Sequence, residues 1–180
     1  MKQQAFTLME LMIVIVIIGI LATVGMVMFG GQSEKAKITS TKANHKTICK
    51  YLAVESQMCE MGQDKILNGE ISCLTIKTKL NSSTQNPAGD ISRALVKALA
   101  GEFKNPYGAN YPPLGDDAVT TSGWSNDRDL GYVRVDPRCC GKAPRKATIN
   151  VNTCSKLPCN GDRWNNTNPN VNVCMIYFYP

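Results

Sequence analysis

Eight cysteines are the residues of this sequence whose type points most directly to chemistry. They are Cys49, Cys59, Cys73, Cys139, Cys140, Cys154, Cys159 and Cys174. Cysteine sulfur either binds a metal such as zinc or joins a second sulfur in a disulfide. The even number favours disulfides. Zinc is the weaker alternative, because the chain has one histidine and no CxxC pair.

Helix geometry limits how these cysteines can pair. Cys49 and Cys59 lie in one predicted helix, about 15 Å apart at 1.5 Å per residue, which is too far for a disulfide. Each must therefore pair outside the helix, and Cys73 gives the shortest sensible closure for Cys59. Cys139 and Cys140 are neighbours, and a bond between neighbours is strained, so we assign them to different partners.

No catalytic site is expected in this chain, and neither a cofactor nor a metal is predicted. Phosphate-binding motifs of the GxxxxGK[ST] and GxGxxG types are absent from the sequence. The single histidine, His45, is predicted to pack in the core rather than to act as a ligand. Asp127 and Asp129 are candidate calcium ligands, although a polar turn is the favoured interpretation. The net charge of +6 leaves nucleic-acid binding possible, but no basic run of five or more residues supports it.

A single carboxylate, Glu10, precedes a long apolar segment. From Leu11 to Phe29 the only polar side chain is Thr23, and no charged residue or proline interrupts the run. A helix of about 20 such residues spans a bilayer and satisfies its own backbone there. Because a carboxylate at the entrance of this segment is costly to insert, we expect Glu10 to find a partner elsewhere.

The amino-terminal segment MKQQA-FTLME-LMIVIVIIGILATVG resembles that of type IV prepilins and pseudopilins. The resemblance implies that prepilin peptidase cuts between Ala5 and Phe6, that the new Phe6 amine is methylated, and that Glu10 acts in assembly. Two positions depart from the family: Ala5 stands where glycine is usual, and Val27 where many pilins have proline. An ordinary anchor helix is the alternative interpretation.

The resemblance also implies a function and a set of partners. The chain would rest in the inner membrane, pass to the pilus assembly machinery there, and polymerise with identical subunits into an extracellular filament for adhesion, motility or DNA uptake. A pseudopilin of a type II secretion system, or a minor pilin that binds DNA or acts as an adhesin, are the alternatives. None of these is an enzyme.

Resemblance to the carboxy-terminal loop of many pilins suggests a disulfide between Cys159 and Cys174. Four cysteines then remain, with three ways to pair, and Cys49 with Cys139 or Cys140 is preferred among them.

The predicted elements give an α+β fold, a long helix on a small antiparallel sheet with disulfides. The expected segments are a leader (1–5), a transmembrane and filament-core helix (6–30), its amphipathic continuation (31–62), a connecting region with a short helix (63–104), and a sheet with a disulfide loop (105–180). One face of the continuing helix gathers Ile38, Thr41, His45, Ile48, Leu52 and Cys59.

Alternation and turn residues locate the remaining elements. Strands are predicted at 132–135, 147–151 and 171–179, with a possible fourth near 118–121. A short strand is possible at Leu74–Ile76, and Asp90 is read as the N-cap of a helix that ends near Gly101. The segment from Asn105 to Tyr111 resembles the turn that precedes the sheet in many pilins.

Overall fold

The computed structural model describes residues 7–82, 85, 87–108, 117–121, 127–138, 146–159 and 168–179. The chain divides into two compact units, Met1–Ala36 and Lys37–Pro180. The first unit is helical where it is described, and the second contains every other element. Each unit is described below by itself.

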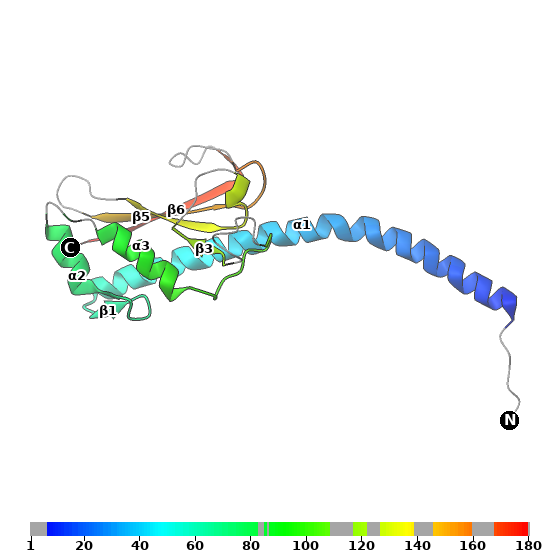
Figure 1. Cartoon of the computed structure of the whole chain (residues 1–180), viewed down its shortest axis with the longest axis horizontal. Coiled ribbons are helices and arrows are strands. Elements are labelled where there is room, and N and C mark those ends of the chain that lie inside the picture. The colour runs from blue at the N-terminus through cyan, green and yellow to red at the C-terminus, as the bar shows by residue number, and fades with distance from the viewer. Residues whose placement is uncertain are drawn as a thin grey trace, which may run out of the picture. The chain divides into compact units, whose positions relative to one another are not determined.

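Helix α1 (Leu8–Glu60) belongs to both units (Figure 1). It ends close to the predicted stop at Gly62, which has a positive φ of 92°. The backbone N–H of Gly62 donates to the Cys59 carbonyl and that of Gln63 to the Met58 carbonyl. This pattern is a common way to satisfy the last carbonyls of a helix, and glycine adopts the left-handed conformation that it needs.

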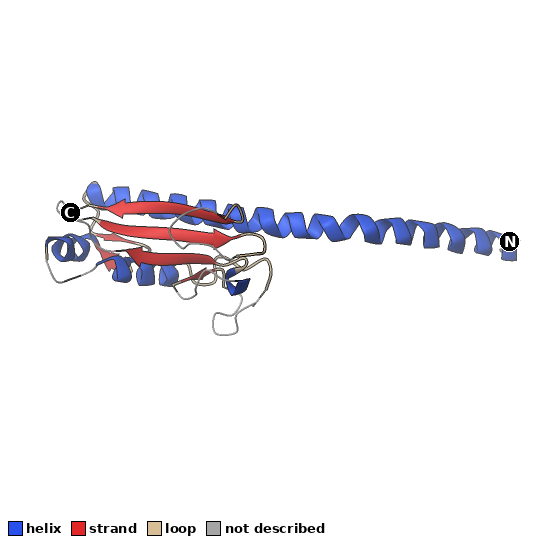
Figure 2. Cartoon of the chain, turned by 90° about the horizontal axis from the view of Figure 1, so that it is seen from above, coloured by secondary structure: helices blue, strands red, loops and turns tan. Residues whose placement is uncertain are grey.

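The second unit is built on a four-stranded sheet in the order β3-β4-β5-β6. The strands are β3 (Val119–Thr120), β4 (Val133–Arg138), β5 (Ala147–Cys154) and β6 (Val171–Phe178). All four overlap predicted strands, the possible fourth included, and β4 and β5 each extend three residues beyond the predicted end. Figure 2 shows the long strands running side by side. The β4–β5 and β5–β6 pairs are antiparallel as expected. Strand β3 instead pairs in parallel with β4. This direction could not be predicted, because alternation in the sequence identifies a strand without fixing its direction.

The core of the second unit lies between one face of this sheet and two helices, α1 and α3 (Pro87–Ala98) (Figure 1). The predicted inner face of α1 is confirmed: Ile38 is half-buried and the other five positions are buried. Successive side chains of a strand alternate between faces. The inward set of β4 and β5 is Val133, Val135, Ile149 and Val151, which are all fully buried.

The connecting region differs from its prediction in two places. Leu74–Ile76 belongs to helix α2 (Cys73–Asn81) rather than to a strand, and Ile76 and Leu80 of that helix are buried at helical spacing. Helix α3 begins at Pro87, so Asp90 lies in its first turn and is not the N-cap. Proline favours the first helical position, because its φ suits a helix and it has no N–H to leave unpaired. A small hairpin, β1 (Lys65–Ile66) with β2 (Ile71–Ser72), was not predicted.

The disulfides correct part of the predicted pairing. Cys59 is bonded to Cys73, as expected from the sequence. The other bonds within the described residues are Cys49–Cys174 and Cys154–Cys159.

The predicted pair Cys159–Cys174 and the preference of Cys49 for Cys139 or Cys140 are therefore wrong. Cys174 sits in the middle of β6, opposite Val151 on the inward face, and so meets α1. Cys139 and Cys140 lie outside the described residues.

Candidate functional site

Helix α1 begins with three reciprocal hydrogen bonds between Thr7 and Glu10. The Thr7 backbone N–H and hydroxyl each donate to Glu10 Oε2 at 2.8 Å, and the Glu10 N–H donates to the Thr7 hydroxyl oxygen at 3.3 Å. This is the capping box that the S/T-x-x-E spacing specifies, and our sequence analysis overlooked it. The two bonds that Thr7 donates to the Glu10 side chain end on the same carboxylate oxygen. Ala5 and Phe6, the predicted cleavage and methylation residues, lie outside the described residues.

The segment Leu8–Gly25 is long and apolar enough to cross a membrane, judged by length and composition. Side chains 8–24 are exposed in the structure, so nothing within the described chain covers this apolar surface. Beyond Glu10, the one polar side chain of this segment is satisfied locally, because the Thr23 hydroxyl donates to the carbonyls of Gly19 and Ile20 at 2.8 and 2.9 Å. The surface is therefore suited to lipid or to other apolar helices.

A turn centred on Asn105 joins the start of β4 to the rest of the second unit. The Asn105 side chain is 5% exposed. Its Oδ1 accepts the Tyr107 N–H at 2.9 Å and its Nδ2 donates to the Leu130 carbonyl at 3.0 Å. Gly131, at φ 82°, lies so close that a Cβ atom there would overlap the Asn105 carboxamide. The described part of the predicted 105–111 turn, residues 105–108, thus packs against the segment that precedes β4. Residues 109–111 lie outside the described residues.

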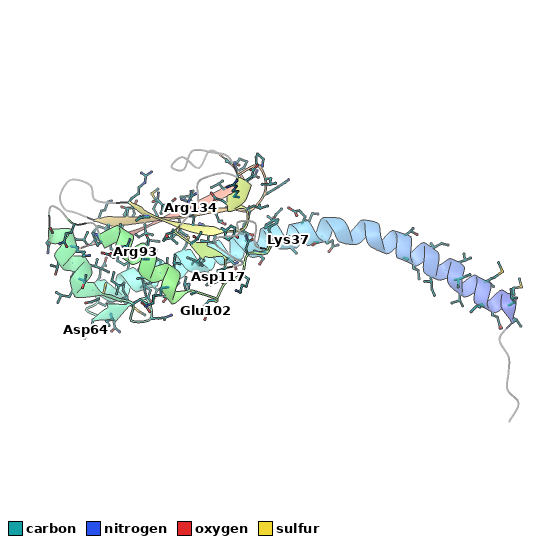
Figure 3. The ribbon with its side chains drawn as sticks, viewed as in Figure 1. Lys37, Asp64, Arg93, Glu102, Asp117 and Arg134 are labelled. Carbon is teal, nitrogen blue, oxygen red and sulfur yellow. A yellow bond between two sulfur atoms is a disulfide. The ribbon has the colours of Figure 1, made fainter. Side chains whose placement is uncertain are left out.

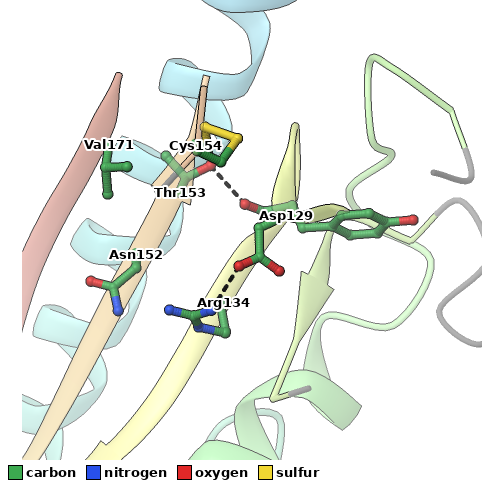
Figure 4. Close-up of a pocket in the computed structure, with 8 residues that line it drawn as sticks. Asp129, Arg134, Asn152, Thr153, Cys154 and Val171 are labelled. Carbon is green, nitrogen blue, oxygen red and sulfur yellow. Dashed lines mark hydrogen bonds and ion pairs between the residues drawn. A yellow bond between two sulfur atoms is a disulfide. The ribbon is translucent and has the colours of Figure 1, made fainter. Parts of the chain in front are cut away.

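The two acids considered as calcium ligands are engaged by protein groups. Asp127 Oδ1 accepts the Cys159 N–H at 2.9 Å. Asp129 Oδ2 accepts from the Arg134 guanidinium at 2.8 Å, as Figure 4 shows. Both lie in the short 3-10 helix η2 (Asp127–Asp129). These contacts agree with the polar-turn interpretation of this segment.

Arg134 is 4% exposed and lies between two carboxylates, Asp129 and Asp136. Asn152 of β5 donates to the same Asp136 oxygen at 2.8 Å. The cavity beside these groups is about 20 Å³, room for about one water molecule rather than for a substrate. Figure 3 shows Arg134 among the side chains of the sheet. We assign this network a structural role, because its buried charges are paired with one another.

His45 packs in the core, as predicted, and it also contacts sulfur. Its Nε2 lies 3.0 Å from the Val151 carbonyl oxygen and 3.5 Å from Cys49 Sγ. Burial lowers the pKa of His45, although the carbonyl contact opposes that shift. Burial therefore favours the neutral form of the ring. Sequence spacing gave a hint of this contact, since residues four apart share a helix face.

Comparison with known proteins identifies the amino-terminal segment. Residues 1–26 match the family model described as the prokaryotic N-terminal methylation motif. Searches of curated proteins and of solved structures found no match. The motif, the apolar helix with Glu10 in its first turn and the disulfide-linked α+β fold agree with one another. The chain therefore carries, at residues 1–26, the signature of type IV pilins and pseudopilins.

Proposed function

We propose that this protein is a pilin, the structural subunit of a type IV pilus. The observation that carries the proposal is the methylation motif placed directly before an apolar helix whose side chains have no cover within the described chain. Before assembly the helix is held by the inner membrane, and after assembly by the helices of identical subunits. One surface thus serves two apolar surroundings in turn.

Processing converts the membrane form into the assembly form. Prepilin peptidase cuts between Ala5 and Phe6, and the new amine of Phe6 is methylated. Removal of the leader also removes Lys2, the only basic residue ahead of the apolar segment. The positive charge at that end is then the amine itself, one residue before the capping box.

Glu10 supplies the matching negative charge. Thr7 donates twice to Oε2, and within the described residues no hydrogen bond reaches Oε1. That oxygen is free to accept the Phe6 amine of a neighbouring subunit in the filament core. A carboxylate left unpaired in such a core is strongly destabilising, so the pair selects one register between subunits.

The test separates the charge of Glu10 from its capping role. In Glu10→Gln the amide oxygen can still accept from Thr7 but the charge is lost. In Thr7→Ala the two hydroxyl bonds of the cap are lost, while the backbone N–H bond and the charge stay. We expect the first variant to be membrane-held yet to yield at least tenfold fewer sheared filaments. The matched Thr7→Ala variant should yield filaments within a fewfold of the unmodified chain. Normal filament numbers from Glu10→Gln would contradict the proposal.

Pseudopilins share the same motif, so location distinguishes the two classes. A pilin is recovered from the medium after shearing, whereas a pseudopilin remains in the envelope after processing. Recovery of the processed chain only from the envelope would favour the secretion-system assignment.

A further inference from the structure

Three side chains of metal-binding type converge beneath the sheet, and neither the methylation motif nor filament assembly accounts for them. His45 and Cys49 lie four residues apart on α1 and so share a helix face, while Cys174 comes from β6. One ligand atom from each lies within 4.8 Å of the other two. His45 is 8% exposed and the two cysteines are half-buried.

The Val151 carbonyl fixes which ring nitrogen of His45 can bind a metal. A carbonyl can only accept, so the 3.0 Å contact with Val151 places the ring proton on Nε2 and leaves the lone pair on Nδ1. Histidines that bind metals commonly donate their second ring N–H to a backbone carbonyl in this way. Nδ1 lies 3.9 Å from Cys49 Sγ, and Nε2 lies 3.5 Å from it, so the ring must turn slightly to bring Nδ1 to a metal shared with that sulfur. Nitrogen and sulfur ligands of one tetrahedral zinc ion lie roughly 3.5 Å apart, given bond lengths of about 2.0 and 2.3 Å.

The two sulfur atoms are joined in the structure, so the site requires the open form of that disulfide. The Cα atoms of Cys49 and Cys174 are 6.5 Å apart, which is toward the upper end of the range for a disulfide. Side-chain rotation alone can therefore separate the sulfurs far enough to admit an ion between them, with α1 and β6 held by the surrounding core.

We propose that, while the Cys49–Cys174 bond is open, His45, Cys49 and Cys174 bind a thiophilic divalent cation of the Zn²⁺ class, with water as the fourth ligand. The nascent chain carries both cysteines as thiols. Binding forms two metal–sulfur bonds and releases the two thiol protons to solvent. Closing the disulfide instead passes two electrons from the two thiols to a disulfide oxidant, which is itself reduced to a dithiol. The cation and the disulfide thus compete for the same sulfur atoms.

The other disulfides of the described residues provide the comparison. Within the part of the chain that the structure describes, His45, Cys49 and Cys174 form the one cluster of three such ligands. Among those same residues, Cys59–Cys73 and Cys154–Cys159 belong to no such cluster. These pairs make matched controls, because opening either of them adds thiols without adding histidine.

The experiment uses the full chain in detergent, reduced with a phosphine that takes up one oxygen from water for each disulfide opened. After removal of the phosphine, the chain is titrated with Co²⁺, whose absorption reports thiolate ligands and tetrahedral geometry. We expect one tight equivalent, displaced by Zn²⁺. His45→Gln and Cys49→Ser should each weaken that equivalent at least tenfold, while the double variants Cys59→Ser/Cys73→Ser and Cys154→Ser/Cys159→Ser should keep it.

Several results would overturn the proposal. One is a His45→Gln chain that binds Co²⁺ as tightly as the unmodified chain, because the sulfurs alone would then explain binding. Another is an equal loss in either double variant. Circular dichroism of the reduced chain is recorded in parallel, and loss of its sheet signal together with loss of the cobalt bands would also refute a preformed site.

Discussion

Gly131→Ala tests the packing of the Asn105 turn against the segment that precedes β4. Gly131 has a φ of 82°, and its backbone N–H donates to the Cys154 carbonyl at 2.9 Å. A Cβ at this position would overlap the Asn105 carboxamide and approach the Tyr107 ring. The substitution therefore imposes an unfavourable backbone conformation and also displaces a buried amide.

The magnitude follows from these two terms. A left-handed φ costs a residue with a Cβ about 1–2 kcal/mol. Displacing the Asn105 side chain breaks its bonds to the Tyr107 N–H and the Leu130 carbonyl, at about 1 kcal/mol each. We expect a loss of about 3–4 kcal/mol in the free energy of unfolding.

Gly101→Ala is the matched control. Gly101 has a similar φ of 78°, but nothing lies within 4 Å of its Cβ position, so only the backbone term applies. The excess of about 2 kcal/mol for Gly131→Ala corresponds to an additional fall of about 4–8 °C in melting temperature. The melting temperatures of both variants are measured by near-ultraviolet circular dichroism of the disulfide-intact full chain in detergent. Equal falls in melting temperature for the two variants would refute the packing of Asn105 against Gly131.

Three further predictions concern single contacts of the second unit. Glu55→Ala removes the buried carboxylate that accepts the Leu67 N–H at 2.6 Å, and should cost about 2 kcal/mol of unfolding free energy in denaturant titration. The hydrogen bond from Lys79 lowers the pKa of Asp90 in the folded protein. The ionised Asp90 therefore stabilises the fold above the unfolded-state pKa of this carboxyl, and that stabilisation is lost as pH falls through the folded-state pKa. Acid unfolding of Asp90→Asn should lack that component. Tyr107→Phe loses a 2.8 Å bond to a backbone carbonyl, and should lower the melting temperature by a few degrees.

Much of the fold follows from periodicity in the sequence. The inner face of α1 repeats at helical spacing and is buried as predicted, with Ile48 and Leu52 at its centre. Strands β4 and β5 begin near the positions that alternation indicated, and β6 lies in the predicted aromatic segment 171–179. Periodicity fails where an element is short: Leu74–Ile76 was read as a strand, although Cys73, Ile76 and Leu80 form a helical stripe. Strand direction is a matter of topology, which explains the parallel β3.

Disulfide pairing depends on strand register, which the sequence alone does not supply. Cys174 meets Cys49 because β6 places it opposite Val151, whose carbonyl contacts His45 on α1. Cys159 instead bonds to Cys154, five residues before it. The methylation motif behaves differently, because its residues act in a contiguous segment that requires no tertiary structure. Its residues could therefore be identified directly, whereas the cluster of His45 with two cysteines could not.

The most direct test of the pilin assignment is the intact mass of the chain recovered from sheared, sedimented filaments, measured with disulfides intact and again after reduction. We predict the mass of a chain that begins at N-methylated Phe6. On reduction this mass should rise by two hydrogens for each disulfide that opens. A mass that begins at Met1, found only in membranes, would contradict processing and assembly, and would leave the apolar helix as an ordinary anchor.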